Sequence, residues 1–206
     1  MLKEIVLPNN NEEEFAGIAS KLGIKKLFFI YDFDKFEEKI REKVGKIEGY
    51  NGIKIEIGFL VSQKNIKKAC KKSSLIVVKS SEQDRFFIEG KKISLIYGFE
   101  EIGKKDFMHQ RASGINHIMC DILKKNNITV GFPYSSLFNK NEIASSILIG
   151  RMMQNIKLCE KYKVKAAIGA FSENPFDLRA PHDIRCLFLS LGMEPKNNRE
   201  SFAIIL

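Results

Sequence analysis

One short polar segment carries the residue types best suited to binding or chemistry, Arg111-Ala-Ser-Gly-Ile-Asn-His117. The apolar residues that follow recur at the spacing of one helix face: Ile115, Ile118, Met119, Ile122 and Leu123. His117 falls on the opposite face. We expect Arg111 just before or within the first turn, where unpaired backbone N–H groups and the helix dipole favour an anion. The pattern predicts a cationic helix start, with Ser113 and Asn116 fixing the local backbone.

A second candidate surface consists of five lysines at helical spacing between positions 63 and 72: Lys64, Lys67, Lys68, Lys71 and Lys72. The other side of this predicted helix carries Ile66, Ala69 and Cys70. No acidic residue interrupts the lysines, so their charges repel one another. We interpret them as contacts to a phosphate backbone, which give affinity and salt dependence rather than sequence reading. A solvated outer face is the alternative.

A third cationic cluster follows the last clear strand, between positions 176 and 185. Pro181 suits the first turn of a helix, so Arg179 lies in the loop that enters it. In a barrel, this loop and Arg111 would lie on the same face, which favours a functional role for Arg179. Arg185 points away from the apolar stripe of that helix, and a surface arginine is the simpler interpretation for it.

The catalytic inventory is poor. The three histidines, His109, His117 and His182, form no pair with metal-ligand spacing, and no GxSxG, Walker or GxGxxG motif occurs. The strand ends offer Asp32, Asp34 and Glu56, which could bind Mg²⁺ but are better explained as a helix cap and surface charges. Asn155, near the apolar stripe of its helix, is expected to make a structural hydrogen bond.

The elements that must position these residues alternate between strand and helix. The predicted strands are 5–7, 27–31, 53–61, 75–79, 93–97, 128–132 and 166–171, with a possible eighth at 202–206. The predicted helices include 34–47, 63–72 and 141–163, and Asn11 is expected to cap the first one. This repetition indicates a parallel sheet covered by helices, hence a TIM-like barrel, with an open doubly wound sheet as the alternative. The whole chain, 1–206, is expected to form one α/β domain.

Composition narrows the class of protein. The 206 residues are 44% hydrophobic and 29% charged, which is typical of a globular domain, and no apolar run approaches the roughly 20 residues that cross a bilayer. The formal net charge of +9 weakly indicates an anionic partner. The four cysteines form no CxxC pair, so we expect reduced thiols in a cytoplasmic protein without a membrane partner.

Four segments occur in the order known from one protein family: 84–87, 111–132, 151–164 and 177–193. Together they resemble archaeal ribonuclease P protein component 3, which is related to the 30-kDa subunit of the eukaryotic enzyme. The matches cover roughly the C-terminal two-thirds of the chain. The N-terminal third is compatible with the family but carries less specific motifs.

The resemblance implies a (β/α) barrel related to metal-dependent phosphoesterases of the polymerase-and-histidinol-phosphatase type. It also implies a subunit of ribonuclease P, which removes the 5′ leader from precursor tRNA, with the catalytic site on the RNA subunit. The chain would bind that RNA and another protein subunit, hold no cofactor, and depend on Mg²⁺ only through the RNA. The first strand ends Val6-Leu7-Pro8, without the histidine pair of the phosphoesterases, which argues against a protein-borne metal site.

Three hypotheses follow. The first is an RNA-binding subunit without catalytic residues of its own, in which Arg111, His117, Arg179 and the lysines contact phosphates, and Arg85 and Lys161 contribute less. The second is a stand-alone metal-dependent phosphoesterase that uses Asp32 and Glu56 with a histidine. The third is a protein scaffold whose partner makes the RNA contacts.

Overall fold

The computed structural model describes residues 2–102, 105–106, 111–138 and 140–196, with the backbone alone at 49–51. Seven parallel strands follow one another around a single sheet in chain order. They are β1 (Lys3–Val6), β2 (Lys26–Asp32), β3 (Lys54–Leu60), β4 (Ile76–Lys79), β5 (Leu95–Tyr97), β6 (Thr129–Pro133) and β7 (Ala166–Gly169). The possible eighth strand at 202–206 lies outside the described residues.

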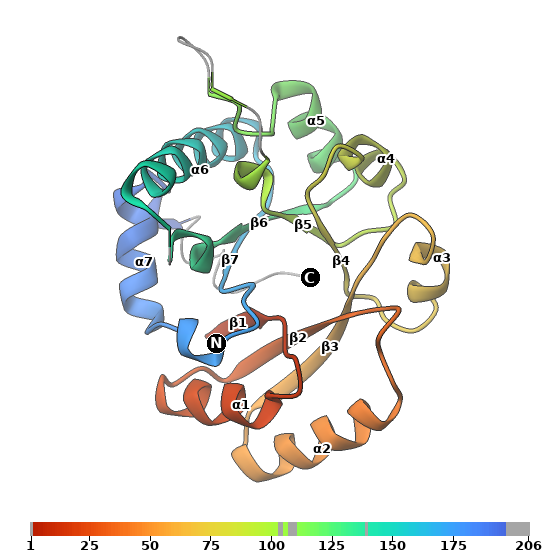
Figure 1. The fold of residues 1–206 in the computed structure, drawn as a ribbon. Coiled ribbons are helices and arrows are strands. Elements are labelled where there is room, and N and C mark those ends of the chain that lie inside the picture. Colours follow the sequence, from red (N-terminus) through yellow and green to blue (C-terminus); the bar gives the residue numbers. More distant parts are fainter. Residues whose placement is uncertain (1, 103–104, 107–110, 139, 197–206) are drawn as a thin grey trace.

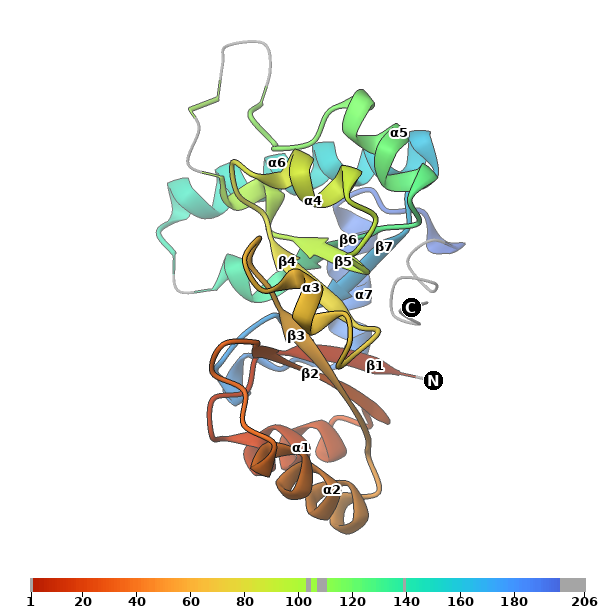
Figure 2. The same cartoon turned by 90° about the vertical axis from the view of Figure 1, so that its right-hand side faces the viewer.

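Helices cover the outside of this sheet (Figures 1 and 2). They are α1 (Glu12–Lys21), α2 (Lys39–Asn51), α3 (Ile66–Ala69), α4 (Asp84–Glu89), α5 (His117–Lys125), α6 (Glu142–Tyr162) and α7 (Pro181–Ser190). Short 3-10 turns follow β5, β6 and β7: η1 (Phe99–Glu101), η2 (Tyr134–Leu137) and η3 (Pro175–Asp177).

The first and last strands meet, so the sheet is a nearly closed barrel. The Phe171 N–H donates to the Ile5 carbonyl and the Leu7 N–H donates to the Ser172 carbonyl, both at 2.9 Å. In a doubly wound sheet the strand order reverses at one point, but here it runs from β1 to β7 without a reversal. The predicted TIM-like barrel is therefore confirmed and the open sheet was wrong.

Glycines make room for aromatic rings inside the barrel. The rings of Tyr97 and Phe171 stack there with their centroids 4.3 Å apart. A Cβ atom at Gly131 would lie 2.7 Å from the Tyr97 Cβ and 2.8 Å from the Phe171 Cζ, closer than packed carbons tolerate. The interior is thus a filled core and not a channel.

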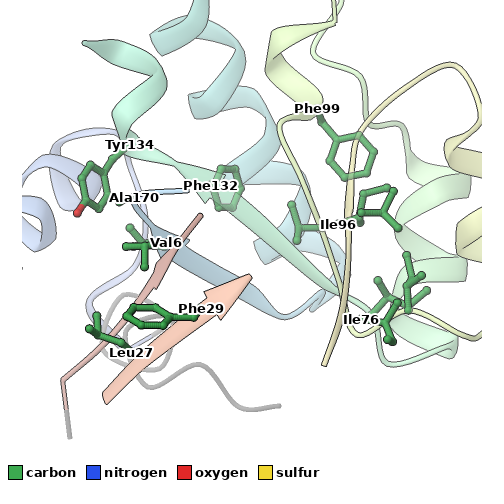
Figure 3. Close-up of a cluster of buried hydrophobic side chains, with 14 of the residues drawn as sticks. Val6, Leu27, Phe29, Ile76, Ile96, Phe99, Phe132, Tyr134 and Ala170 are labelled. Carbon is green, nitrogen blue, oxygen red and sulfur yellow. The ribbon is translucent and has the colours of Figure 1, made fainter. Parts of the chain in front are cut away.

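The larger core lies between the strands and the helices, where Phe29, Ile96 and Phe132 point outward from the sheet (Figure 3). The predicted apolar stripe of the long helix α6 is confirmed, because all four of its residues are buried against this core: Leu148, Met152, Ile156 and Cys159. The same helix also buries Arg151 and Asn155.

A buried carboxyl group lies at the seam between β1 and β7. Glu4 Oε1 accepts the Ala170 N–H at 2.7 Å and the Ile5 N–H at 3.0 Å, and Oε2 accepts the Tyr134 hydroxyl at 3.1 Å. Burial raises the pKa of Glu4 to about 7, against which the three hydrogen bonds work. No pattern in the sequence distinguishes Glu4 from a surface carboxylate.

Three expected elements differ from the structure. The helix predicted at 34–47 begins at Lys39, because the Asp32 carboxylate accepts the Asp34 N–H at 3.0 Å and holds a turn there. The helix predicted at 63–72 is a single turn, Ile66–Ala69. Beyond it, Ser73 turns the chain into β4 by bonding the Ile57 carbonyl. Asn11 precedes α1 but its side chain makes no cap, since it accepts the Asn9 N–H and donates to the Glu173 carbonyl.

Candidate nucleic-acid interface

The connection from β5 to α5, which carries Arg111, is fastened to α6 by a buried arginine. Arg151 Nη1 donates to the carbonyls of Glu100 at 3.1 Å and Ile102 at 2.9 Å. Its Nε and Nη2 bond the same carboxylate oxygen of Asp106 at 2.9 and 2.7 Å. Desolvation alone would raise the pKa of Asp106, but the hydrogen bonds and charge of Arg151 hold it below its ordinary value. The connection is therefore anchored from outside, by a neighbouring helix.

Two amides on the next turn of α6 extend this anchor to Ser113. The Asn155 side chain donates to the Ser113 carbonyl at 2.8 Å, and the Gln154 side chain donates to the Ser113 hydroxyl at 3.0 Å. Gly114, at φ +88°, lets the backbone approach so closely that a Cβ there would lie 2.5 Å from the Phe99 carbonyl oxygen. Ser113 and Asn155 thus hold the backbone of this connection in place, as predicted for a structural role.

Glu100 is fully buried beneath the same connection. Its Oε2 lies 3.5 Å from the Asn155 amide nitrogen, whereas Glu100 Oε1 and Asn155 Oδ1 have no hydrogen-bond partner among the described residues. Burial raises the pKa of Glu100 to about 8, and the nearby Glu101 charge adds to the shift. The raised pKa favours the neutral form of this carboxyl group.

Arg111 does not lie at the helix start, contrary to the prediction. The cap of α5 is Asn116, whose Oδ1 accepts the Met119 N–H at 2.9 Å, and Arg111 lies five residues earlier. Its exposed guanidinium rests on α6, where Nη1 donates to the Gly150 carbonyl at 3.2 Å. The contact depends on glycine, because a Cβ at position 150 would lie 2.8 Å from the Arg111 Cζ.

His117 is the first residue of α5 and is exposed, whereas Ile118, predicted in the apolar stripe, is 56% exposed. The other four residues of the predicted stripe do pack against the core: Ile115 and Leu123 are buried, and Met119 and Ile122 are partly buried. The buried Cys120 joins them, so the predicted stripe is confirmed except at Ile118.

Arg179 occupies the loop between β7 and α7, as predicted. Its Nη1 donates to the carbonyls of Phe176 at 2.6 Å and Leu178 at 2.9 Å, and its guanidinium lies 4.6 Å from the centre of the Phe138 ring. This loop and the connection that carries Arg111 both follow carboxyl ends of parallel strands, so both arginines belong to the same rim of the barrel. Arg185, on α7, is half-buried.

The five predicted lysines are all exposed, but they form a turn around α3 rather than one face of a longer helix. An acidic residue does reach them, because Lys72 pairs with Glu38 from the start of α2 at 2.8 Å. Two weaker candidates lie on other helices. Arg85 pairs with Glu89 at 2.7 Å, and the Lys161 ammonium lies 5.6 Å from the centre of the Tyr162 ring.

The acids proposed for a metal site do not converge. Glu56 pairs in register with Phe28, four residues or about 13 Å along β2 from Asp32. Its carboxylate bonds the Lys26 ammonium at 2.5 Å, and Asp34 accepts the Asn65 amide. Within the described ranges, no group of three or more His, Cys, Asp or Glu side chains could hold a metal ion.

An open hollow of about 510 Å³ lies at the carboxyl ends of β1, β2 and β3. Its charged lining is mostly acidic: Glu12, Asp32, Glu37 and Glu173, with Lys35. Glu12 is itself buried and bonds Lys43 at 2.7 Å and the Tyr31 hydroxyl at 3.2 Å. A phosphate would be repelled here, whereas the exposed Arg111 and Arg179 lie on the loops that follow β5 and β7.

Among the described helices, none combines the length and apolar character needed to span a bilayer. The four cysteines are free thiols, two buried and two exposed.

Comparisons with known proteins agree on one family. A family profile described as RNase P subunit p30 matches residues 8–203. Ribonuclease P protein component 3 of Methanocaldococcus jannaschii is 27% identical over 180 residues, which are 82% of this chain and 73% of that protein. The Thermococcus gammatolerans protein of the same name is 26% identical over 82% of this chain and 76% of its own length.

Solved structures share the fold. A chain in a cryo-EM structure of archaeal ribonuclease P with mature tRNA superposes with a TM-score of 0.84 at 21% identity, covering 98% of this chain and 87% of its own. A crystal structure of an amidohydrolase gives a TM-score of 0.56 at 10% identity, covering 97% of this chain and 71% of its own.

Proposed function

The chain belongs to the RNase P subunit p30 family, and we infer that it acts as a protein subunit of ribonuclease P, the ribonucleoprotein that removes the 5′ leader from precursor tRNA. The observation that carries this proposal is the family match, which runs over residues 8–203. The chain assists the catalytic RNA, and the isolated protein does not itself cleave. Mg²⁺ acts through the RNA subunit and no cofactor binds the protein. We place the complex in the cytoplasm.

The RNA subunit and precursor tRNA are bound by the side of the barrel rim that carries Arg111 and Arg179. Arg111 and Arg179 support this proposal because both guanidiniums are exposed and retain N–H groups that can bond phosphate. Further N–H donors to phosphate come from His117 and from the lysines at 64, 67, 68, 71 and 72. Smaller contributions come from Arg85, Arg185 and Lys161. Another protein subunit of the complex is the second partner.

The test is leader cleavage reconstituted from the RNA and protein subunits, with and without this chain, over a range of Mg²⁺ concentrations. We expect cleavage at low Mg²⁺ to require the chain and cleavage at high Mg²⁺ to require it less. Hydrolysis of a phosphodiester by the purified chain without RNA, in the presence of divalent metal, would instead support the stand-alone phosphoesterase.

A salt titration of RNA binding tests the lysine contacts. Replacing Lys64, Lys67 and Lys68 by Gln should lower the slope of log affinity against log salt by about 0.7 to 0.9 for each phosphate that is no longer neutralised. The matched control is Lys72→Gln, because Lys72 is already paired with Glu38 and should change the slope less. Equal slopes for the triple variant and the unmodified chain would remove the lysines from the interface.

A further inference from the structure

We propose that Phe176 and Arg179 form a binding site for an unpaired nucleotide, whose base stacks on the Phe176 ring while its phosphate bonds the Arg179 guanidinium. The proposal rests on the function inferred above and gives it a ligand class, single-stranded rather than duplex RNA. The two residues lie on one short loop between β7 and α7.

The Phe176 ring is held out into solvent. It is 73% exposed, and of the large apolar side chains in the described part of the chain only Ile143, at 76%, is more exposed. A whole aromatic ring left in water forgoes the favourable free energy of burial. Such a ring is available for stacking without any rearrangement of the core.

The loop that presents this ring is ordered by its own side chains. Asn174 Oδ1 accepts the Phe176 N–H at 3.1 Å, and the preceding Pro175 is buried. The Ser172 hydroxyl donates to Asp177 at 2.5 Å and accepts the Asn174 N–H at 3.0 Å. A preorganised loop loses little conformational entropy when a ligand binds, so the stacking energy goes into affinity.

Arg179 supplies an uncompensated charge beside the ring. Its Nη1 donates to the Phe176 carbonyl at 2.6 Å, which ties the guanidinium to the residue that carries the ring. Within the described residues, its Nε and Nη2 donate to no protein acceptor and no carboxylate lies within ion-pair distance of it. Three N–H groups are therefore free to bond phosphate, and the Phe138 ring centre lies 4.6 Å from the guanidinium.

This pairing of an aromatic face with a guanidinium fits single-stranded RNA. Every base has a face that can stack on a ring, and unpaired bases are free to do so, whereas bases inside a duplex are already stacked on one another. A docking site for a protein would need a wider apolar surface. The other side chains at the tip of this loop, Glu173 and Asn174, are exposed and polar.

The experiment measures binding of the full-length protein to the ribonuclease P RNA in a salt titration, with four variants. Phe176→Ala and Phe176→Leu should each lower affinity about fivefold to a hundredfold, with an unchanged salt slope, because they remove stacking and leave every phosphate interaction in place. Phe176→Tyr should bind like the unmodified chain. Arg179→Gln should lower the log–log slope by about 0.7.

The matched control is Phe86→Ala on α4. Phe86 is 51% exposed and also adjoins an arginine, but that arginine, Arg85, is paired with Glu89. This variant should bind RNA normally. Circular dichroism and thermal unfolding of each variant verify that the fold is retained.

Three results would overturn the nucleotide site. Phe176→Leu could bind as well as Phe176→Tyr, which would mean that aromatic stacking is not used. Phe176→Ala could spare RNA binding and weaken assembly with another protein subunit, which would make the ring a protein contact. A chain that neither binds the RNA nor alters reconstituted cleavage would overturn the proposed function as well.

Discussion

The two loops that carry the exposed arginines are held in opposite ways. The connection that carries Arg111 is fastened by α6, through side chains 39 to 51 residues away along the chain. In the loop that carries Arg179, the bonds that hold the arginine and the turn before it join residues one to five apart, while Leu7 and Asn11 bond only the carbonyls of Ser172 and Glu173 at its start. The first arginine is therefore positioned by tertiary packing and the second by local hydrogen bonds, so damage to α6 should affect only the first.

Arg151→Met tests this difference with the largest expected effect. The change removes the arginine donor from two carbonyl groups and from the Asp106 carboxylate, which keeps the Ala112 N–H, so the free energy of unfolding should fall by about 3 kcal/mol. Denaturant unfolding measures it. The companion change Arg179→Met, at an exposed site, should cost less than about 1 kcal/mol. Equal losses in the two variants would contradict the contrast between the loops.

Glu100→Gln should alter the pH dependence of stability. Because burial raises the pKa of Glu100 from 4.5 to about 8, its contribution to stability is fully present below pH 4.5 and is lost as the pH rises towards 8. The variant's free energy of unfolding should fall less steeply between pH 5 and 8. Urea titrations at several pH values measure the slope. Glu4, with a pKa of about 7, acts in the same direction, so some slope should persist in the variant.

Gly150→Ala should displace the Arg111 side chain without destabilising the fold. The added Cβ would lie 2.8 Å from the guanidinium, which is the mobile end of a side chain and can move away. Stability should stay level or rise by up to about 1 kcal/mol, the usual gain from alanine in a helix, while RNA affinity changes. The control is Gly45→Ala on α2, where a Cβ meets nothing within 4 Å. If both variants bind RNA alike, the contact of Arg111 with α6 has no functional role.

Asn174→Ala probes the locally held loop and has the smallest expected effect. It removes the side-chain bond to the Phe176 N–H, which should cost about 0.5 to 1 kcal/mol. Thermal unfolding should detect that loss. Affinity for RNA should fall by a few-fold as the ring loses its fixed orientation, and affinity changes at Arg111 variants should add to it independently.

The same contrast explains what the sequence could predict. The alternation of apolar strand runs with segments of helical spacing predicted the barrel and the buried stripe of α6, because the spacing of apolar residues reflects local backbone geometry. The placement of Arg179 was correct for the same reason, because Pro181 marks the following helix start. The placement of Arg111 was wrong, because Gly114 and the contacts from Arg151 and Asn155 turn the chain onto a helix that lies far along the sequence.

Other features needed the fold as well. Glu4 and Glu100 look like ordinary charged residues in the sequence, and only their burial in the fold raises their pKa values. The lysines between 64 and 72 have the spacing of a helix, yet like charges weaken that helix and Ser73 ends it at the entrance to β4. Family resemblance supplied the function, which neither charge nor periodicity could have named.

The seam between β1 and β7 determines when the barrel can close during folding. The Glu4 carboxylate meets Ala170 across 166 residues and Tyr134 across 130, so the seam cannot close until most of the chain has left the ribosome. Until then β1 and β7 are both free sheet edges, which are prone to pair with other chains. Contacts of such long sequence separation also form slowly. Closure is therefore the step that ends the exposure of both sheet edges, and a Glu4→Gln variant should reveal it as a change in refolding rate.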